Sequence, residues 1–191
     1  MLTIHTDPQV YGPEDDTYLL LEALENEEFS GEGLEIGIGT GIVALNVCHH
    51  FTKFVGVDIN PRAVELAEKN AHINQVENVQ FFESDLFSHV DGTFDTIIFN
   101  PPYVPADEDV QMIEDLSYHG GEDGRQMIDQ FLNQVQCYLK PDGKVYLLQS
   151  SLSGIEKTES LLEGMGFSFE IIGRQKLFFE ELVVFKIYRE E

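Results

Sequence analysis

Short apolar runs alternate with amphipathic segments along most of the chain. Apolar runs bounded by turn residues predict strands at residues 34–37, 53–57, 79–83, 96–99, 144–148, 168–172 and 182–188. Apolar residues at helical spacing predict helices at residues 14–26, 40–50, 60–74, 124–139 and 155–165. The remaining segments are predicted to be a linker at residues 30–33, a turn at residues 141–143 and a long loop at residues 101–122.

Strands that alternate with helices indicate an α/β fold with a parallel sheet. Because crossover connections are right-handed, such a sheet is doubly wound, with helices on both faces. The segment 182–188 is apolar at most positions, as expected for a strand that is covered on both sides. We predict a single domain over residues 1–191, in which residues 1–30 form an N-terminal segment and helix and residues 31–191 form the core.

Ligands of doubly wound sheets bind beyond the carboxyl ends of the strands, so residues that follow a strand are the candidates for chemistry. Gly37, Gly39 and Gly41 follow the first predicted strand and open a helix. Glycines permit a close approach of the backbone to a ligand. Their Gly-x-Gly-x-Gly spacing differs from the Gly-x-Gly-x-x-Gly of dinucleotide sites, and a tight structural turn is the alternative.

Carboxylates follow the second and third predicted strands. Asp58 is placed to accept hydrogen bonds from the two adjacent hydroxyls of a ribose. Its alternative role is a helix N-cap, for which Asn60 before a proline is better suited. Asp85 is placed to accept the amino group of an adenine, with Leu86 as an apolar edge, although acidic residues are also common in turns.

The fourth strand is followed by the most specific short motif of the chain, Asn100-Pro101-Pro102-Tyr103. The asparagine brings one amide oxygen, and Pro101 has no backbone donor, so the local backbone presents carbonyls. Tyr103 offers a flat face. Such a corner suits a planar NH2 group, which donates two hydrogen bonds and stacks on an aromatic ring; a rigid proline turn is the structural alternative.

Taken in this order and at these spacings, the glycine turn, the two aspartates and the Asn-Pro-Pro-Tyr motif resemble the class I S-adenosylmethionine-dependent methyltransferases that methylate amino groups. The segment Val10–Leu21 narrows the resemblance to the HemK-related eukaryotic and archaeal release-factor glutamine methyltransferases. The segment Gly120–Arg125 is similar to the Gly-Gly-x-x-Gly-Arg segment of that family. The chain departs from the family pattern at Gly12 and at Asp15, where glutamate is usual.

The resemblance implies a Rossmann-like, seven-stranded and mostly parallel sheet with an antiparallel last strand, and S-adenosyl-L-methionine as the cofactor. It implies a substrate glutamine in the Gly-Gly-Gln loop of a class 1 translation release factor, held by Asn100, Pro101 and Tyr103 as catalytic groups. No metal site is expected. The implied cofactor-binding residues are Asp16, Thr17, Glu35, Gly37, Gly39, Gly41, Asp58, Ile59, Asp85, Leu86 and Asn100.

Charge bears on the partners of the protein. Eleven lysines and arginines against 35 aspartates and glutamates give a net charge of −24. Binding to nucleic acid phosphates needs a cationic surface, so direct nucleic-acid binding is not expected. The acidity suits solubility, a salty cytoplasm or the steering of a basic protein. The family resemblance implies a heterodimer with a small zinc-binding methyltransferase activator protein.

Three other functions stay open at this point. An adenine-amino methyltransferase acting on DNA or RNA would use the same Asn-Pro-Pro-Tyr corner on a flipped base, but the net charge opposes it. Methylation of a lysine in another protein would not need two hydrogen-bond acceptors. A non-catalytic binding subunit would have no use for intact cofactor motifs.

The remaining signals concern location and structure. No apolar run approaches the about 20 residues of a membrane span, and Met1–His5 does not resemble a signal peptide. Cys48 and Cys137 match no metal-ligand spacing and predict reduced thiols that pack in the interior. We therefore expect a cytoplasmic protein without membrane contact. Arg125, near the start of a predicted helix, is expected to form a structural ion pair.

Overall fold

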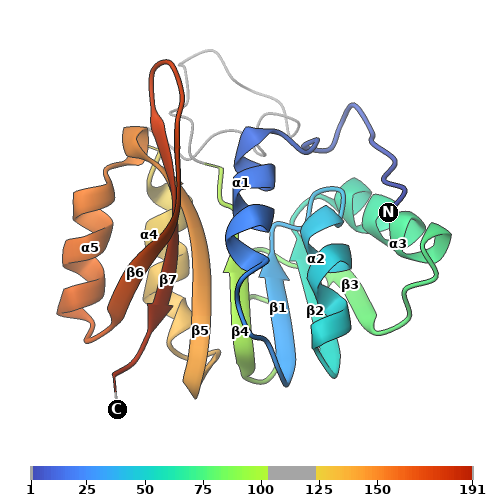
Figure 1. Ribbon diagram of the computed structural model, residues 1–191. Coiled ribbons are helices and arrows are strands. Elements are labelled where there is room, and N and C mark those ends of the chain that lie inside the picture. The colour runs from blue at the N-terminus through green and yellow to red at the C-terminus, as the bar shows by residue number, and fades with distance from the viewer. Residues whose placement is uncertain (1, 103–123, 191) are drawn as a thin grey trace.

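A single seven-stranded sheet in the order β3-β2-β1-β4-β5-β7-β6 organises the molecule (Figure 1). The computed structural model describes residues 2–102 and 124–190. Neighbouring strands are parallel except for β7, which runs antiparallel to both β5 and β6. This confirms the predicted mostly parallel sheet with an antiparallel last strand. The strands are β1 (Glu32–Ile36), β2 (Lys53–Asp58), β3 (Val79–Glu83), β4 (Phe94–Phe99), β5 (Leu139–Ser150), β6 (Ser168–Lys176) and β7 (Glu181–Tyr188).

Helices cover both faces of the sheet, as the alternation of elements predicts (Figure 1). Helices α1, α2 and α3 pack on one face, and α4 and α5 pack on the other. Their bounds are α1 (Asp15–Leu24), α2 (Ile42–Val47), α3 (Pro61–Ile73), α4 (Gln126–Val135) and α5 (Ile155–Gly164). Short 3-10 helices at Cys48–His50 (η1) and Ser151–Ser153 (η3) follow α2 and β5.

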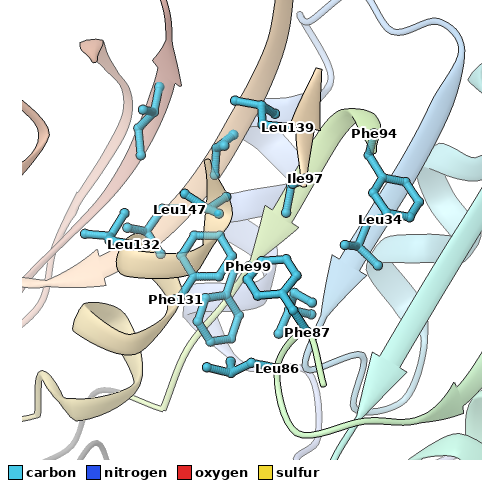
Figure 2. Close-up of a cluster of buried hydrophobic side chains, with 14 of the residues drawn as sticks. Leu34, Leu86, Phe87, Phe94, Ile97, Phe99, Phe131, Leu132, Leu139 and Leu147 are labelled. Atoms are coloured by element: carbon cyan, nitrogen blue, oxygen red, sulfur yellow. The ribbon is translucent and has the colours of Figure 1, made fainter. Parts of the chain in front are cut away.

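The central strands are apolar on both faces. In β4, Ile97 and Phe99 belong to the core beneath α4 and α5, whereas Ile98 between them belongs to the core beneath α1, α2 and α3. Figure 2 shows the first of these cores, in which the Phe131 ring of α4 lies 4.7 Å from the ring of Phe99 and 5.5 Å from that of Phe87. Full burial of each such ring contributes about 1.5–3 kcal/mol to stability.

A partly buried ion pair fixes the chain that follows α1 to the sheet. Glu27 accepts hydrogen bonds from the Tyr146 hydroxyl of β5 at 2.6 Å and from the Lys186 ammonium of β7 at 3.2 Å. The Phe29 ring then packs edge-on against Tyr146, with the ring centroids 5.7 Å apart. These contacts hold α1 against the face of the sheet, and α1 carries two of the predicted site residues.

The N-terminal segment is tied to α3 by asparagine side chains. Asn74 exchanges two hydrogen bonds with the backbone of Thr3, both 2.8 Å long. Asn70 does the same with the backbone of His5, at 2.9 and 3.0 Å. The side-chain amides of two successive turns of the helix therefore bind the segment as a neighbouring strand would.

Two predicted boundaries differ from the structure through pairing between distant segments. β1 begins at Glu32 rather than Leu34, because Glu32 and Gly33 already pair with Lys53 and Phe54 of β2. α4 ends at Val135 rather than Leu139, because Leu139 pairs with Phe94 at the start of β5. These partners lie far away in the sequence, so local periodicity could not indicate them.

Two other differences arise in the last strands. The predicted turn at residues 141–143 lies within β5, whose register with β4 shifts between Leu139 and Lys144, so that residues 140–143 bulge out of the pairing. β6 continues four residues beyond the predicted end, because Lys176 still pairs with Glu181. The two strands therefore form a longer hairpin than the sequence predicts.

The structure tests three of the smaller predictions. Cys48 is buried, but Cys137 is exposed, so the prediction of two interior thiols is wrong for the cysteine that lies in the turn after α4. Arg125 is 4% exposed and forms the predicted ion pair, with Asp129 at 2.6 Å. Among residues 2–102 and 124–190, no helix has the length and apolar character needed to cross a membrane.

We predict that Glu27→Gln lowers the free energy of unfolding by about 2 kcal/mol at pH 7, because the partly buried Lys186 would lose its charged hydrogen-bond partner. Burial raises the pKa of Glu27, but the hydrogen bonds and charge of Tyr146 and Lys186 outweigh it and lower the pKa below the ordinary value of 4.5. The pair therefore stabilises the fold above pH 4.5, and its contribution is lost as the pH falls through the lowered pKa.

Urea denaturation of the wild type and of Glu27→Gln at several pH values measures this difference. Glu28→Gln is the matched control, since Glu28 is exposed. A stability difference that stays constant between pH 7 and pH 3 would contradict the role assigned to the pair.

Candidate functional site

A cavity of about 300 Å³ opens at the carboxyl ends of β1, β2, β3 and β4, beneath the N-terminal segment and α1. Its size lies at the lower end of the range for small-molecule sites. The position is the one expected for a doubly wound sheet, where the strand order reverses between β1 and β4. The predicted site residues that line the cavity are Asp16, Thr17, Glu35, Gly37, Gly39, Asp58, Ile59, Asp85, Leu86, Asn100 and Pro101.

Two predicted site residues are not among those that line the cavity. Gly41 caps the start of α2 in a left-handed conformation with φ of 78°. A Cβ at this position would lie 2.9 Å from the Cβ of Ala67, so the glycine allows α2 and α3 to pack closely. Tyr103 lies outside the described residues, as do nearly all of the predicted loop 101–122 and the start of the Gly120–Arg125 segment.

The glycine turn and the end of β2 are locked together through Asp58. One carboxylate oxygen accepts the Gly39 N–H at 3.0 Å, and the other accepts the Asn60 N–H at 2.9 Å. Gly39 has φ of 50°, and a Cβ there would lie 3.3 Å from the carbonyl oxygen of Tyr11. The turn thus brings backbone donors to Asp58 and leaves the carboxylate fixed at the cavity wall.

Asp58 is therefore not the N-cap of α3. Asn60 has that role, since its side-chain oxygen accepts the Arg62 N–H at 3.0 Å. Burial raises the pKa of Asp58, against the hydrogen bonds from the backbone N–H groups of Asn60, Gly39 and Ile59. A fixed carboxylate at a strand end can accept hydrogen bonds from adjacent hydroxyl groups of a ligand.

Glu35 contributes another carboxyl group to the wall of the cavity, and it is 3% exposed. Burial raises its pKa well above the ordinary value; the Ala44 backbone hydrogen bond opposes this shift and the charge of Asp58 adds to it. The Oε2 atom has no hydrogen-bond partner among the described residues. A buried polar atom without a partner is costly, so this atom is suited to a polar group of a bound ligand.

The turn after β3 has a strained backbone. Leu86 has φ of 46°, which side chains with a Cβ rarely adopt. The Ser84 hydroxyl holds the turn by donating to the Leu86 carbonyl at 2.9 Å. Asp85 between them is exposed at the cavity rim. Strain of this kind gathers at ligand sites, and here it lies in the turn from which Asp85 and Leu86 line the cavity.

The most informative contact of the site joins α1 to the end of β4. The amide nitrogen of Asn100 donates to the Asp16 Oδ2 atom at 3.0 Å. The same oxygen accepts the Tyr11 hydroxyl at 2.9 Å, and Oδ1 accepts the Thr17 N–H at 2.6 Å. Because a carboxylate accepts hydrogen bonds only, it fixes which end of the Asn100 amide faces it.

The orientation leaves the Asn100 oxygen as a buried acceptor. Asn100 Oδ1 has no hydrogen-bond partner among the described residues, and Asn100 lines the cavity beside Pro101. An unpaired oxygen next to a proline carbonyl can receive the two N–H groups of a planar amide or amine. The cavity therefore combines a fixed carboxylate at Asp58, which is suited to hydroxyl groups, with a buried acceptor at Asn100, which is suited to an NH2 group.

Among the polar residues of the cavity that were not predicted as site residues, Tyr11 and Glu180 make the most informative contacts. Tyr11 belongs to the N-terminal motif, and its spacing from Asp16 on the following helix could have indicated the contact between them. Glu180 reaches the cavity from the turn between β6 and β7, and no local pattern connects it with the other strand ends.

Comparison with known proteins gives consistent results. The family model described as "Methyltransferase small domain" matches residues 1–178. A candidate protein N5-glutamine methyltransferase of Methanocaldococcus jannaschii is 46% identical over 185 residues, which cover 95% of this chain and 93% of that protein. The release factor glutamine methyltransferase of Lactococcus lactis is 32% identical over 157 residues; the match covers 76% of this chain and 58% of that protein.

A solved structure also resembles the chain over most of its length. It is the E. cuniculi Mtq2-Trm112 complex, described as responsible for methylation of the eRF1 translation termination factor. The similarity has a TM-score of 0.78 and a sequence identity of 27%, and it covers 95% of this chain and 99% of the other.

We predict that Gly41→Ala lowers the free energy of unfolding by about 2–4 kcal/mol. The left-handed backbone costs about 1–2 kcal/mol with a Cβ, and the contact with Ala67 adds the cost of overpacking. Gly92→Ala is the control, because Gly92 has φ of 92° and open space around its Cβ position, so that only the backbone cost applies. Thermal unfolding of both variants measures the difference, and equal losses would contradict a packing role for Gly41.

Proposed function

The chain belongs to the methyltransferase small domain family, and we propose that it transfers the methyl group of S-adenosylmethionine to the side-chain amide nitrogen of a protein glutamine. The resemblance noted in the sequence is thereby confirmed at the level of the family. The observation that carries the proposal is the oriented amide of Asn100, whose oxygen is buried and free to accept a hydrogen bond from the substrate.

The residues of the cavity fit S-adenosylmethionine. Asp58 would hold the ribose hydroxyls and Asp85 the adenine amino group, with Leu86 against the adenine ring. The unpaired Glu35 oxygen and the Thr17 hydroxyl provide further polar contacts on the side of the glycine turn. The bound cofactor would supply a methyl group on a positively charged sulfur.

The substrate amide is a poor nucleophile, because its nitrogen lone pair is delocalised into the carbonyl. Asn100 Oδ1 and the Pro101 carbonyl would accept hydrogen bonds from the two N–H groups of the amide. The nitrogen lone pair would then point toward the cavity. Both acceptors also stabilise the positive charge that grows on the nitrogen. Asp16 keeps the Asn100 oxygen in place, so the geometry exists before the substrate arrives.

The reaction needs no strong base before transfer. Once the nitrogen has gained the methyl group, it becomes acidic and releases a proton to water or to a nearby carboxylate. An asparagine suits this corner better than an aspartate, because it stays neutral and presents one oxygen in a fixed direction. The catalytic contribution of the chain is thus mainly positioning and electrostatics.

As the substrate we propose the Gly-Gly-Gln glutamine of a class 1 translation release factor. The L. lactis relative is named for release factors, and the E. cuniculi complex methylates a termination factor. The net charge of −24 disfavours the alternative of an adenine-amino methyltransferase, which would have to bind nucleic acid directly. Termination takes place on ribosomes, and this substrate therefore implies a cytoplasmic protein.

We also propose a heterodimer with a small zinc-binding activator. The E. cuniculi protein was solved in complex with Trm112. In this chain, β3 is a terminal strand of the sheet, and partly exposed apolar residues lie on it and before it, among them Val76, Val79 and Phe82. A partner strand could pair with such an edge and cover the apolar side chains.

The experiment that tests the function is a methyl-transfer assay with purified protein. The chain is incubated with labelled S-adenosylmethionine and a release factor, with and without the activator. Mass spectrometry of the product then locates the methyl group. Modification of the Gly-Gly-Gln glutamine supports the proposal, whereas a methyl group on a lysine of the factor would refute it.

We predict that two substitutions separate catalysis from cofactor binding. Asn100→Ala removes the amide acceptor and should lower turnover by about 100-fold or more, with the affinity for S-adenosylhomocysteine nearly unchanged. Asp58→Ala removes a charged acceptor of the ribose and should weaken that affinity by about tenfold or more. Calorimetric titration and the methyl-transfer assay measure both effects. A large loss of cofactor affinity in Asn100→Ala would contradict the role given to Asn100.

A further inference from the structure

The turn between β6 and β7 exposes two adjacent aromatic side chains. Phe178 and Phe179 are 91% and 85% exposed, the highest values among the large apolar residues described. Their rings contact each other edge to face, with centroids 4.6 Å apart. The turn itself is closed by a hydrogen bond of 2.8 Å from the Leu177 N–H to the Glu180 carbonyl. Two phenyl groups are therefore presented to solvent on an ordered turn.

The turn is anchored at the mouth of the cavity. The Ser150 hydroxyl at the end of β5 donates to the Glu180 carboxylate, and Glu180 lines the cavity. The Glu181 N–H donates to the Ser151 hydroxyl at 3.0 Å. Figure 1 shows the β6–β7 hairpin extending past the sheet at the end where the parallel strands finish. One residue of the turn thus faces the cavity while the two before it face outward.

Exposed apolar groups of this size are unfavourable unless a partner covers them. A lone exposed hydrophobic residue needs no explanation, but a contiguous pair beside a cavity marks an interaction site. Leu152, which is 51% exposed, lies on η3, and the neighbouring Ser151 is bonded to the hairpin. Burial of a phenyl group contributes enough binding energy for the pair to act as an anchor.

We propose that Phe178 and Phe179 dock an apolar side chain of the polypeptide substrate close to its target glutamine. This inference rests on the proposed function. A protein glutamine that enters the cavity brings its flanking residues past the turn, because Glu180 belongs to the cavity wall. The activator proposed above would lie at β3, which is at the opposite edge of the sheet from β6.

Charge favours the same occupant. Two copies of the chain, each with a net charge of −24, would repel each other, which disfavours self-association through this turn. The negative net charge of the chain attracts a basic polypeptide. This attraction raises the association rate but does not fix the orientation of the bound polypeptide. The two phenyl rings would provide the specific short-range contact that fixes the position of the polypeptide.

The test compares two double variants with the wild type. Phe178→Ser with Phe179→Ser removes the apolar surface, and Phe178→Leu with Phe179→Leu keeps it. We expect the serine pair to raise the KM for the release factor by about tenfold, as for loss of an interface anchor, and the leucine pair to change it by less than about threefold. Affinity for S-adenosylhomocysteine should not change, because neither phenylalanine is among the residues that line the cavity.

Direct binding of the release factor to each protein is measured alongside turnover, so that the two proposals can fail separately. If the wild type methylates the factor and the serine pair does so with an unchanged KM, the docking role is wrong and the proposed function stands. If the wild type binds the factor through the phenyl pair without methylating it, the function is wrong and the docking role stands. Loss of activator binding or of self-association in the serine pair, with release-factor binding intact, would assign the surface to those partners and overturn the inference.

Discussion

A carboxylate that accepts hydrogen bonds from three residues connects the N-terminal helix to the end of β4. Asp16 receives the amide of Asn100, the hydroxyl of Tyr11 and the backbone N–H of Thr17. A free asparagine amide could face the cavity with either its oxygen or its nitrogen. The carboxylate removes this ambiguity, since only the nitrogen end can donate to it. The orientation of the Asn100 amide therefore depends on Asp16 of α1, and on the contacts that hold α1 against the sheet.

Burial of polar groups matters both where α1 contacts the sheet and within the cavity. Glu27 holds the end of the helix through Tyr146 and Lys186, on the same face that α1 covers. Within the cavity, the carboxyl groups of Glu35 and Asp58 have raised pKa values because they are withdrawn from water. Polar groups that lack hydrogen-bond partners lower the free energy of unfolding. The burial of apolar side chains on both faces of the sheet offsets that cost.

The sequence predicted what is local and missed what is assembled from distant segments. The strands, the helices and the residues that follow each strand were predicted from alternation, because each signal lies within a few residues of its element. The order of the strands in the sheet depends on pairing between distant segments and was not predicted. The Asp16–Asn100 bond joins residues 84 positions apart, and nothing local indicates it. For the same reason Glu180 was not expected in the cavity. Gly41 was grouped with the cavity glycines by its spacing, but its contact with Ala67 only becomes visible once two helices are packed.

The asparagines of α3 grip the N-terminal segment only by its main chain. Asn70 and Asn74 form hydrogen bonds with the N–H and carbonyl groups of His5 and Thr3. The Asn60 amide donates to the Gln9 carbonyl at 2.9 Å. Main-chain groups are the same in every amino acid except proline. The exposed residues of this segment can therefore change without loss of these bonds. Val10 and Tyr11 are constrained, because Val10 packs against Ala63 and Leu66 of α3 and the Tyr11 hydroxyl donates to Asp16.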